Sequence, residues 1–305
     1  MKLLHRFRRF AGTFLATSLL ASTSTADTPF PSTYQAPSHT PTIITNATVL
    51  TGTGQKLESA SLYFVDGRIV SVGEQPKTLS EDTRVIDVDG AWVTPGIIDV
   101  HSHLGVYPSP GVDAHSDGNE ATAPVTAEVW AEHSVWPQDP GFGRALAGGI
   151  TAMQILPGSA KLLGGRGVTL KHVASVTYQG MKFPGAPYGL KMACGENPKR
   201  VYGRKGSGPS TRMGNIAGYR AAWIKATDYR DEHAKYAALS DEEKIKAKKP
   251  KRDLELETLA GVLNGDIIIH MHCYRADEMM TILDLAKEFN YTVGTFHHGV
   301  EAYKI

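Results

Sequence analysis

Hydrophobic and β-branched residues alternate with turn residues from Thr42 onwards, which predicts a small β-sheet domain at residues 42–94. Residues 42–50 are rich in β-branched side chains, and Asp66-Gly67 and Asp89-Gly90 separate further short alternating segments. Asp-Gly pairs between such segments are typical of β-hairpins.

From Pro95 the pattern changes to short apolar runs that alternate with stretches of helical periodicity. Residues 142–147 and 275–289 are the clearest predicted helices. Strands buried on both faces read as continuous apolar runs, and their alternation with helices favours a parallel α/β sheet. The number of strand–helix units predicts that residues 95–305 form a TIM-like barrel, here incomplete with about six strands. The predicted strands are 97–100, 150–156, 168–176, 189–193, 266–272 and 291–297.

Residues 213–262 interrupt this rhythm with a charged, alanine-rich stretch, which predicts a helical insertion. Ser240, followed three residues later by Glu243, has the spacing of a capping box. Residues 244–252 carry six basic side chains. They fit either a surface for an anionic partner or a solvated helix end, and the flanking acids favour the solvated helix end.

The first 26 residues have the layout of a secretory signal peptide. A basic start precedes an apolar run at residues 10–21, and Ser24 and Ala26 fit a cleavage site. The alternative, a membrane anchor, would need a longer apolar run. We therefore expect export to the periplasm or the medium without membrane attachment after cleavage. Residues 27–41, which are rich in Pro, Ser and Thr, predict a flexible leader.

The composition argues against a nucleic-acid partner, and it does not decide whether the two cysteines form a disulfide. The chain has 305 residues, 41% of them hydrophobic, and a formal net charge of +1. A nucleic-acid-binding protein usually shows a clear basic excess, so we expect no such partner. Cys194 and Cys273 are the only cysteines. We expect two buried thiols, although a disulfide forms if the fold brings them together.

His101 and His103 close the first predicted barrel strand and form the first candidate metal-binding pair. Alternate strand residues point the same way, so both imidazoles should project into the barrel mouth. Barrel enzymes place their sites at this carboxyl end of the strands. Two neutral imidazoles from one strand end suit Zn²⁺ or a similar ion.

Later strands offer further histidines. His270 and His272 point to one side of their strand, and His272 lies nearer the mouth. His270 lies one layer deeper, where a hydrogen-bonded core histidine is an equal alternative. His297 and His298 end the next strand, and adjacent residues face opposite sides, so we expect only one of them to enter the barrel.

Lys191 stands alone in the apolar strand 189–193. Burial disfavours its charged form, and a neutral amine can react with CO₂ to give a carbamate that bridges two metal ions. Taken alone, a lysine whose amine reaches out to solvent is the better interpretation.

Together, four segments resemble the amidohydrolase superfamily, and in particular its imidazolonepropionase-related branch, which includes Xaa-Pro and other dipeptidases. They are residues 42–54, 65–73, 85–90 and 94–103, the last reading Thr-Pro-Gly-Ile-Ile-Asp-Val-His-Ser-His. The resemblance implies a metal-bearing (β/α)8 barrel beside a composite β-sandwich, of which residues 42–94 would be the N-terminal part.

The resemblance also implies a ligand set and a reaction. One or two divalent ions, zinc first among them, would be held by His101, His103, Lys191, His272 and His298, with Lys191 carboxylated in two-metal members. His270 and His297 remain alternatives. The implied reaction is hydrolysis of a C–N bond in a small amide or short peptide by a metal-activated water. Whether identical chains associate is left open.

The sequence departs from the family pattern at its end. Seven residues follow His298, so the last two barrel strands and the catalytic aspartate expected after the eighth strand would lie beyond Ile305. We therefore identify no catalytic acid or base and expect a truncated or partial sequence. The alternatives are an inactive fragment that at most binds metal or a small ligand, and a solute-binding or adhesive envelope protein.

Overall fold

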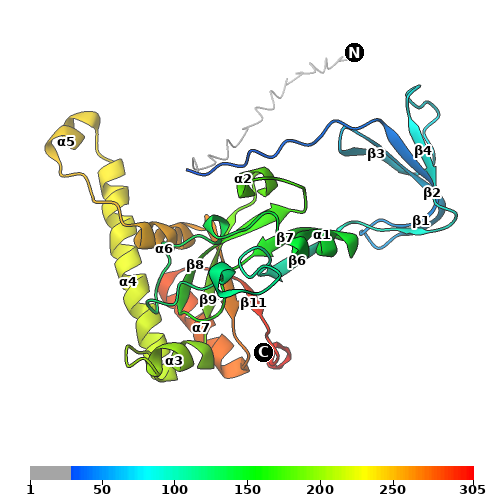
Figure 1. Cartoon of the computed structure of the whole chain (residues 1–305). Coiled ribbons are helices and arrows are strands. Elements are labelled where there is room, and N and C mark those ends of the chain that lie inside the picture. The colour runs from blue at the N-terminus through cyan, green and yellow to red at the C-terminus, as the bar shows by residue number, and fades with distance from the viewer. Residues whose placement is uncertain (1–28) are drawn as a thin grey trace, which may run out of the picture. The chain divides into compact units, whose positions relative to one another are not determined.

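The computed structural model describes residues 29–305 (Figure 1). The predicted signal peptide, residues 1–26, lies outside the described residues. Residues 31–41 form no helix or strand. Part of this predicted leader is nevertheless hydrogen-bonded to residues much later in the chain: the Thr33 amide donates to the Gln179 carbonyl over 3.0 Å, and the Ser32 hydroxyl to the Lys182 carbonyl over 2.7 Å.

A five-stranded sheet follows, at the residues where the alternating pattern predicted strands. Its main order is β3-β2-β1-β4, and β5 also pairs with β1. Ala47, Val49 and Ala60 form its small buried core. Residues 42–94 form this one sheet, and a second layer of the sandwich stays a prediction. The strands are β1 (Thr42–Leu50), β2 (Lys56–Val65), β3 (Arg68–Gly73), β4 (Arg84–Asp87) and β5 (Trp92–Val93).

Residues 97–305 form a mixed α/β unit around a curled six-stranded sheet (Figure 1). The strand order is β11-β10-β9-β8-β7-β6, so each strand lies beside its neighbour in the sequence. The strands are β6 (Ile97–Ser102), β7 (Ile150–Ile155), β8 (Leu163–Lys171), β9 (Tyr188–Ala193), β10 (Ile267–His272) and β11 (Val293–His297).

The expectation of an all-parallel sheet is wrong at β8. This strand runs antiparallel to both β7 and β9, whereas the pairs β6–β7, β9–β10 and β10–β11 are parallel. A short connection without a helix joins β7 to β8, and such a connection reverses the chain direction. β8 also begins five residues before the predicted strand, because its glycine-rich start at residues 163–167 carries no apolar pattern.

Helices begin and end at the expected chemical signals. The Thr211 hydroxyl caps α4, Asp253 caps α6, and Gly265 ends α6 in the left-handed conformation. The capping box of Ser240 and Glu243 is confirmed at the start of α5. The helices are α1 (Pro140–Ala147), α2 (Tyr178–Met181), α3 (Glu196–Gly203), α4 (Arg212–Ala237), α5 (Asp241–Lys246), α6 (Leu254–Asn264) and α7 (Ala276–Phe289).

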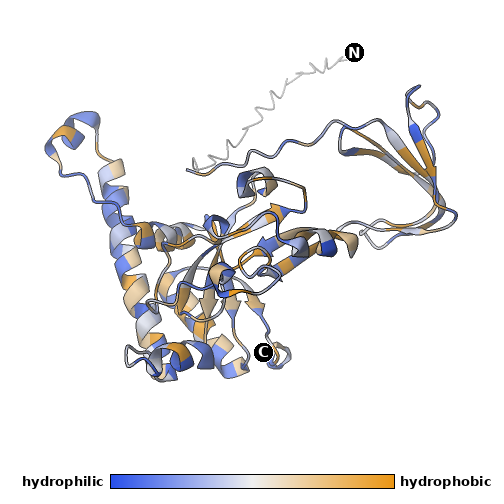
Figure 2. Ribbon diagram, in the orientation of Figure 1, coloured by the Kyte–Doolittle hydropathy of each residue, from blue (hydrophilic) through white to orange (hydrophobic). Residues whose placement is uncertain are grey.

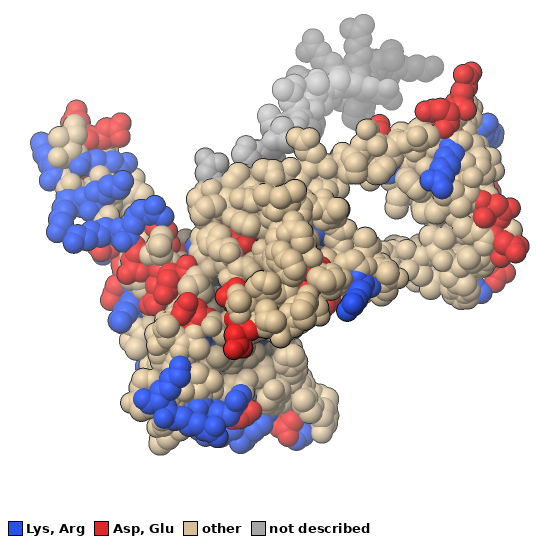
Figure 3. All heavy atoms as spheres, viewed as in Figure 1, with Lys and Arg blue, Asp and Glu red and all other residues tan. Residues whose placement is uncertain are grey.

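The main core is formed by β9, β10 and the helices α4, α6 and α7. Trp223 and Tyr219 of α4 are fully buried against Leu190 of β9, Ile269 of β10 and Leu259 of α6. Figure 2 shows hydrophobic residues along these central strands. Figure 3 shows basic and acidic side chains together over α5, and Asp241, Glu242 and Glu243 open that helix. The acids beside the basic stretch favour a solvated helix end.

The six-stranded sheet is open at β6 and β11. Ile97, Ile98 and Val100 of β6 are 56%, 65% and 57% exposed, so this apolar strand is not covered by other described residues. Among residues 29–305, no helix has the length and apolar character needed to cross a membrane.

Candidate metal centre

His101 and His103 lie together at the carboxyl end of β6. Their Nε2 atoms are 3.3 Å apart, and His103 Nδ1 lies 2.7 Å from the Leu156 carbonyl oxygen. A carbonyl can only accept, so Nδ1 carries the proton and the lone pair of Nε2 is free to bind a cation. A metal-binding histidine commonly donates its other ring N–H in this way.

His297, which ends β11, and His298, which follows it, both join this pair. The ring centroids of His297 and His298 lie 4.4 Å and 4.6 Å from that of His101. The expectation that only one of them enters is therefore wrong. His298 has a φ of +55°, so the chain leaves the extended conformation there and the alternation of a strand no longer applies.

His270 and His272 of β10 have different surroundings. His270 Nδ1 lies 2.9 Å from His297 Nε2, so His270 is hydrogen-bonded beneath the cluster. The ring of His272 lies 5.0 Å from that of His298. Asn197 Nδ2 contacts His272 Nε2 over 3.2 Å, whereas His272 Nδ1 is buried without a hydrogen-bond partner among the described residues. An amide N–H donates, so Nε2 accepts in this contact and Nδ1 carries the ring proton; Nδ1 offers a lone pair to a metal ion only in the other tautomer, with the proton on Nε2.

Lys191 lies on β9 in register with His270, and it is 1% exposed. Its amine donates to Ser159 Oγ over 2.8 Å and to the Pro157 carbonyl over 3.4 Å. Burial, with a contribution from the nearby cation of Lys161, lowers the pKa of Lys191 to about 7. A large fraction of this amine is therefore neutral near neutral pH, as carbamate formation requires.

Burial also keeps the histidines neutral. It lowers the pKa of His101 and His297 to about 3, and that of His270 and His272 to about 4, and the positive charge of Lys191 adds to each shift. A neutral imidazole is the form that binds a metal ion. Within residues 29–305 the buried Nδ1 atoms of His101 and His272 have no hydrogen-bond partner, so each is an unused lone pair or an unpaired N–H group. This donor set fits one or two divalent cations.

The described chain is similar to known amidohydrolases over most of its length. The solved structure of an amidohydrolase from Thermotoga maritima matches it with a TM-score of 0.78 and 38% identity, over 86% of this chain and 66% of that one. Amidohydrolase tasK of Hapsidospora irregularis is 33% identical over 242 residues, or 74% of this chain and 24% of tasK. The chain is a member of the amidohydrolase superfamily.

Proteins with other names match shorter stretches of the chain. A 5-methylthioadenosine/S-adenosylhomocysteine deaminase of Halalkalibacterium halodurans is 35% identical over 100 residues, or 32% of this chain. No protein-family model matches the sequence. The chain spans 66% of the Thermotoga protein and 24% of tasK.

In this amidohydrolase-superfamily chain the two cysteines form a disulfide, so the expectation of two free thiols is wrong. Cys194 follows β9 and Cys273 follows β10, and Ala193 pairs with His272 in the sheet. The next residues therefore lie side by side, with their Cα atoms 5.2 Å apart. Glu278 lies near both sulfurs, but bonded sulfurs are not thiolate ligands, so this group is no metal site.

Several residues around the centre could not be identified from any pattern in the sequence. Ser159, Asn197 and Leu156 reach Lys191, His272 and His103 from loops and from the start of α3. Lys161 is a second lysine with 1% exposure. Its loop contains no buried-strand pattern, so burial could not be expected there. The only sign of its burial in the sequence is that Lys161 stands among the small and apolar residues 155–165.

Proposed function

We propose that the protein is a metal-dependent hydrolase of C–N bonds in small amides or short peptides. The observation that carries this proposal is the convergence of neutral histidines and a buried lysine at the carboxyl ends of β6, β9, β10 and β11. Membership of the amidohydrolase superfamily supports it. Within that superfamily we favour the imidazolonepropionase-related and dipeptidase branch, from the segment that ends in His103.

The ligand set we propose has two parts. His101 and His103 would hold one divalent ion, and His272 and His298 would hold a second. Lys191 would add an oxygen ligand after its neutral amine bonds to the carbon of CO₂ and releases a proton. A bound zinc ion would supply Lewis acidity for the amide carbonyl and for a water molecule.

The protein's own residues would set the geometry and the charge. Leu156 fixes the ring of His103 through its carbonyl, and Asn197 fixes His272. Ser159 and Pro157 hold the Lys191 amine beside the histidines. We assign the proton-transfer step to none of the described residues.

We also propose that the protein works outside the cytoplasm. The Cys194–Cys273 disulfide supports this location, because disulfides persist mainly in oxidising compartments. The cysteines should stay bonded in protein recovered from the periplasm or the medium, and mass spectrometry with thiol alkylation measures this directly. Free thiols there would contradict the proposal.

The test of the proposed function is hydrolysis of dipeptide and cyclic-amide libraries, including Xaa-Pro dipeptides and imidazolone-type rings, by the zinc-loaded protein produced with any coding sequence that continues beyond Ile305. We expect turnover that is lost in the His101→Ala/His103→Ala variant and retained in His39→Ala, a control at an exposed histidine. Zinc binding without turnover of any library member would favour the alternative, a protein that binds metal but does not hydrolyse. Failure to bind zinc would reject both.

A further inference from the structure

Two buried polar groups without a partner line one cavity, which is formed by residues 106–134 and 157–161. Lys161 is 1% exposed, and its Nζ has no hydrogen-bond partner among the described residues. The Asn119 Oδ1 atom is likewise buried without a partner within residues 29–305. Burying a donor or an acceptor in this way is costly. Because both side chains line the same cavity, one bound molecule can satisfy both.

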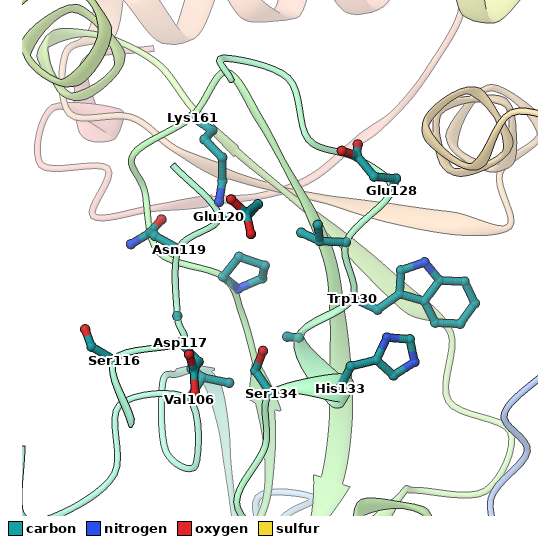
Figure 4. Close-up of a pocket in the computed structure, with 14 residues that line it drawn as sticks. Val106, Ser116, Asp117, Asn119, Glu120, Glu128, Trp130, His133, Ser134 and Lys161 are labelled. Atoms are coloured by element: carbon teal, nitrogen blue, oxygen red, sulfur yellow. The ribbon is translucent and has the colours of Figure 1, made fainter. Parts of the chain in front are cut away.

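The cavity has room for a small molecule. Its volume is about 400 Å³, whereas one water molecule in the liquid occupies roughly 30 Å³. Figure 4 shows Lys161 extending into this space toward Asn119 and Glu120, with Glu128 and Trp130 along another side. A volume of this size is within the usual range for small-molecule sites. None of the described residues that line it is a candidate metal ligand, so other groups must recognise what binds there.

Asn119 is held in place by its neighbours. Its Nδ2 donates to the Tyr107 hydroxyl over 2.6 Å, which leaves Oδ1 as the atom that accepts from a ligand. A Cβ added at Gly158 would collide with the Asn119 amide, and one added at Gly118 with the Tyr107 ring. Glycine at both positions therefore leaves the space that the amide and the ring occupy.

Lys161 supplies the donor that complements this acceptor. Its side chain passes Gly164, where an added Cβ would lie 3.1 Å from Lys161 Cε. Burial lowers the pKa of Lys161 to about 8, and Glu120 and Glu128 oppose that shift. The amine is therefore mostly protonated at neutral pH, and in that form it can only donate.

The charges around the cavity favour a neutral ligand. Three carboxylates line it, those of Asp117, Glu120 and Glu128, against the one ammonium of Lys161. A carboxylate ligand would add a fourth negative charge and would place a second acceptor against Asn119 Oδ1. A primary carboxamide has no net charge, and its carbonyl accepts while its NH₂ group donates.

We propose that this cavity binds a small neutral molecule with a primary carboxamide, whose carbonyl accepts from Lys161 and whose NH₂ group donates to Asn119. Val106, Val129 and Pro157 also line the cavity and offer an apolar surface to the rest of the molecule. This binding requires neither a metal ion nor the proposed hydrolysis.

Matched aromatic probes test the proposal on the unaltered chain. We would measure by calorimetry the binding of benzamide, N,N-dimethylbenzamide and benzoate. Benzamide should bind about tenfold more tightly than either of the others, because both lack the N–H that reaches Asn119 and benzoate also adds a negative charge. Equal or tighter binding of either compound, or no measurable binding of benzamide, would overturn the proposal.

Variants locate the bound probe. Lys161→Met should weaken benzamide binding about tenfold, whereas Lys248→Met, a control at an exposed lysine, should leave it unchanged. His101→Ala/His103→Ala should also leave it unchanged, since neither histidine is among the described residues that line the cavity. Full affinity in Lys161→Met, or loss of binding in the histidine variant, would contradict the assignment to this cavity.

A cross-linking experiment on the unaltered protein covers the case in which Lys161→Met does not fold. An aryl azide derivative of benzamide, activated by light, should label peptides within residues 106–134 or 157–161, as read by mass spectrometry, and excess benzamide should suppress that label. Label confined to other peptides, or label that benzamide does not suppress, would overturn the proposal. A failure to hydrolyse the amide libraries would reject the proposed function and leave this binding result standing.

Discussion

At the scale of single residues, the candidate centre depends on contacts that orient each donor atom. His103 is fixed by the carbonyl of Leu156, and His272 by the amide of Asn197. Removing such a partner typically lowers metal affinity 10–100-fold without removing a ligand. Hydrogen bonds that orient the rings distinguish a metal-binding site from histidines that lie close together by chance.

Asn197→Ala should therefore weaken zinc binding about tenfold, because the ring of His272 is no longer held. Competition with a chromophoric chelator measures this affinity. Asn264→Ala, at the exposed end of α6, is the matched control and should leave the affinity unchanged. If the two variants bind zinc alike, Asn197 has no part in the site.

The direction of a side chain could be predicted from the sequence only where the backbone is regular. The alternation along a strand places His101 beside His103, and His270 on the same side as His272. His298 was expected from the resemblance alone, and its left-handed backbone turns it toward the same cluster as His297, which alternation does not predict. Lys161 and Asn197 lie in loop and helix-start positions, where no period relates side-chain direction to sequence.

At the scale of elements, the disulfide joins the ends of β9 and β10 just beyond Lys191 and His272. It closes a loop with a sequence separation of 79, which contains α3, α4, α5 and α6. A cross-link of this span restricts the unfolded chain strongly. The disulfide should therefore stabilise the register of the two strands that carry candidate ligands.

Cys194→Ser/Cys273→Ser should lower the free energy of unfolding by about 4 kcal/mol. Urea titration of the variant and of the unaltered chain, each with and without reductant, measures this. Reductant should destabilise only the unaltered chain. No difference between the two proteins under oxidising conditions would contradict a structural role for the bond.

Element positions were otherwise well predicted, for a physical reason. β1, β9, β10 and β11 carry apolar or β-branched runs, and α7 has helical periodicity with acidic residues in its first turn. The direction of β8 was not predictable, because it depends on the length and path of its connections. The cysteine pairing depends in turn on the register between β9 and β10, which no local pattern encodes.

At the scale of the whole molecule, the chain spans 66% of the Thermotoga amidohydrolase, and its main sheet has two open edges. Ile97, Ile98 and Val100 leave β6 with an exposed apolar surface. Unpaired apolar edge strands promote association with other chains.

The 305-residue chain should therefore self-associate with rising concentration, and Ile98→Lys should reduce this association by placing a charge on the exposed strand. Size-exclusion chromatography with light scattering measures the mass of both proteins. Ile245→Lys, at an exposed position of α5, is the control. Equal masses for all three proteins at every concentration would contradict this account.

The central claim is that nitrogen donors at the strand ends hold a divalent ion. X-ray absorption spectroscopy of the zinc-loaded chain tests it most directly. The account predicts a shell of nitrogen and oxygen ligands at about 2.0–2.1 Å that is lost in His101→Ala/His103→Ala. Sulfur ligands at about 2.3 Å, or an unchanged zinc shell in the double variant, would contradict it.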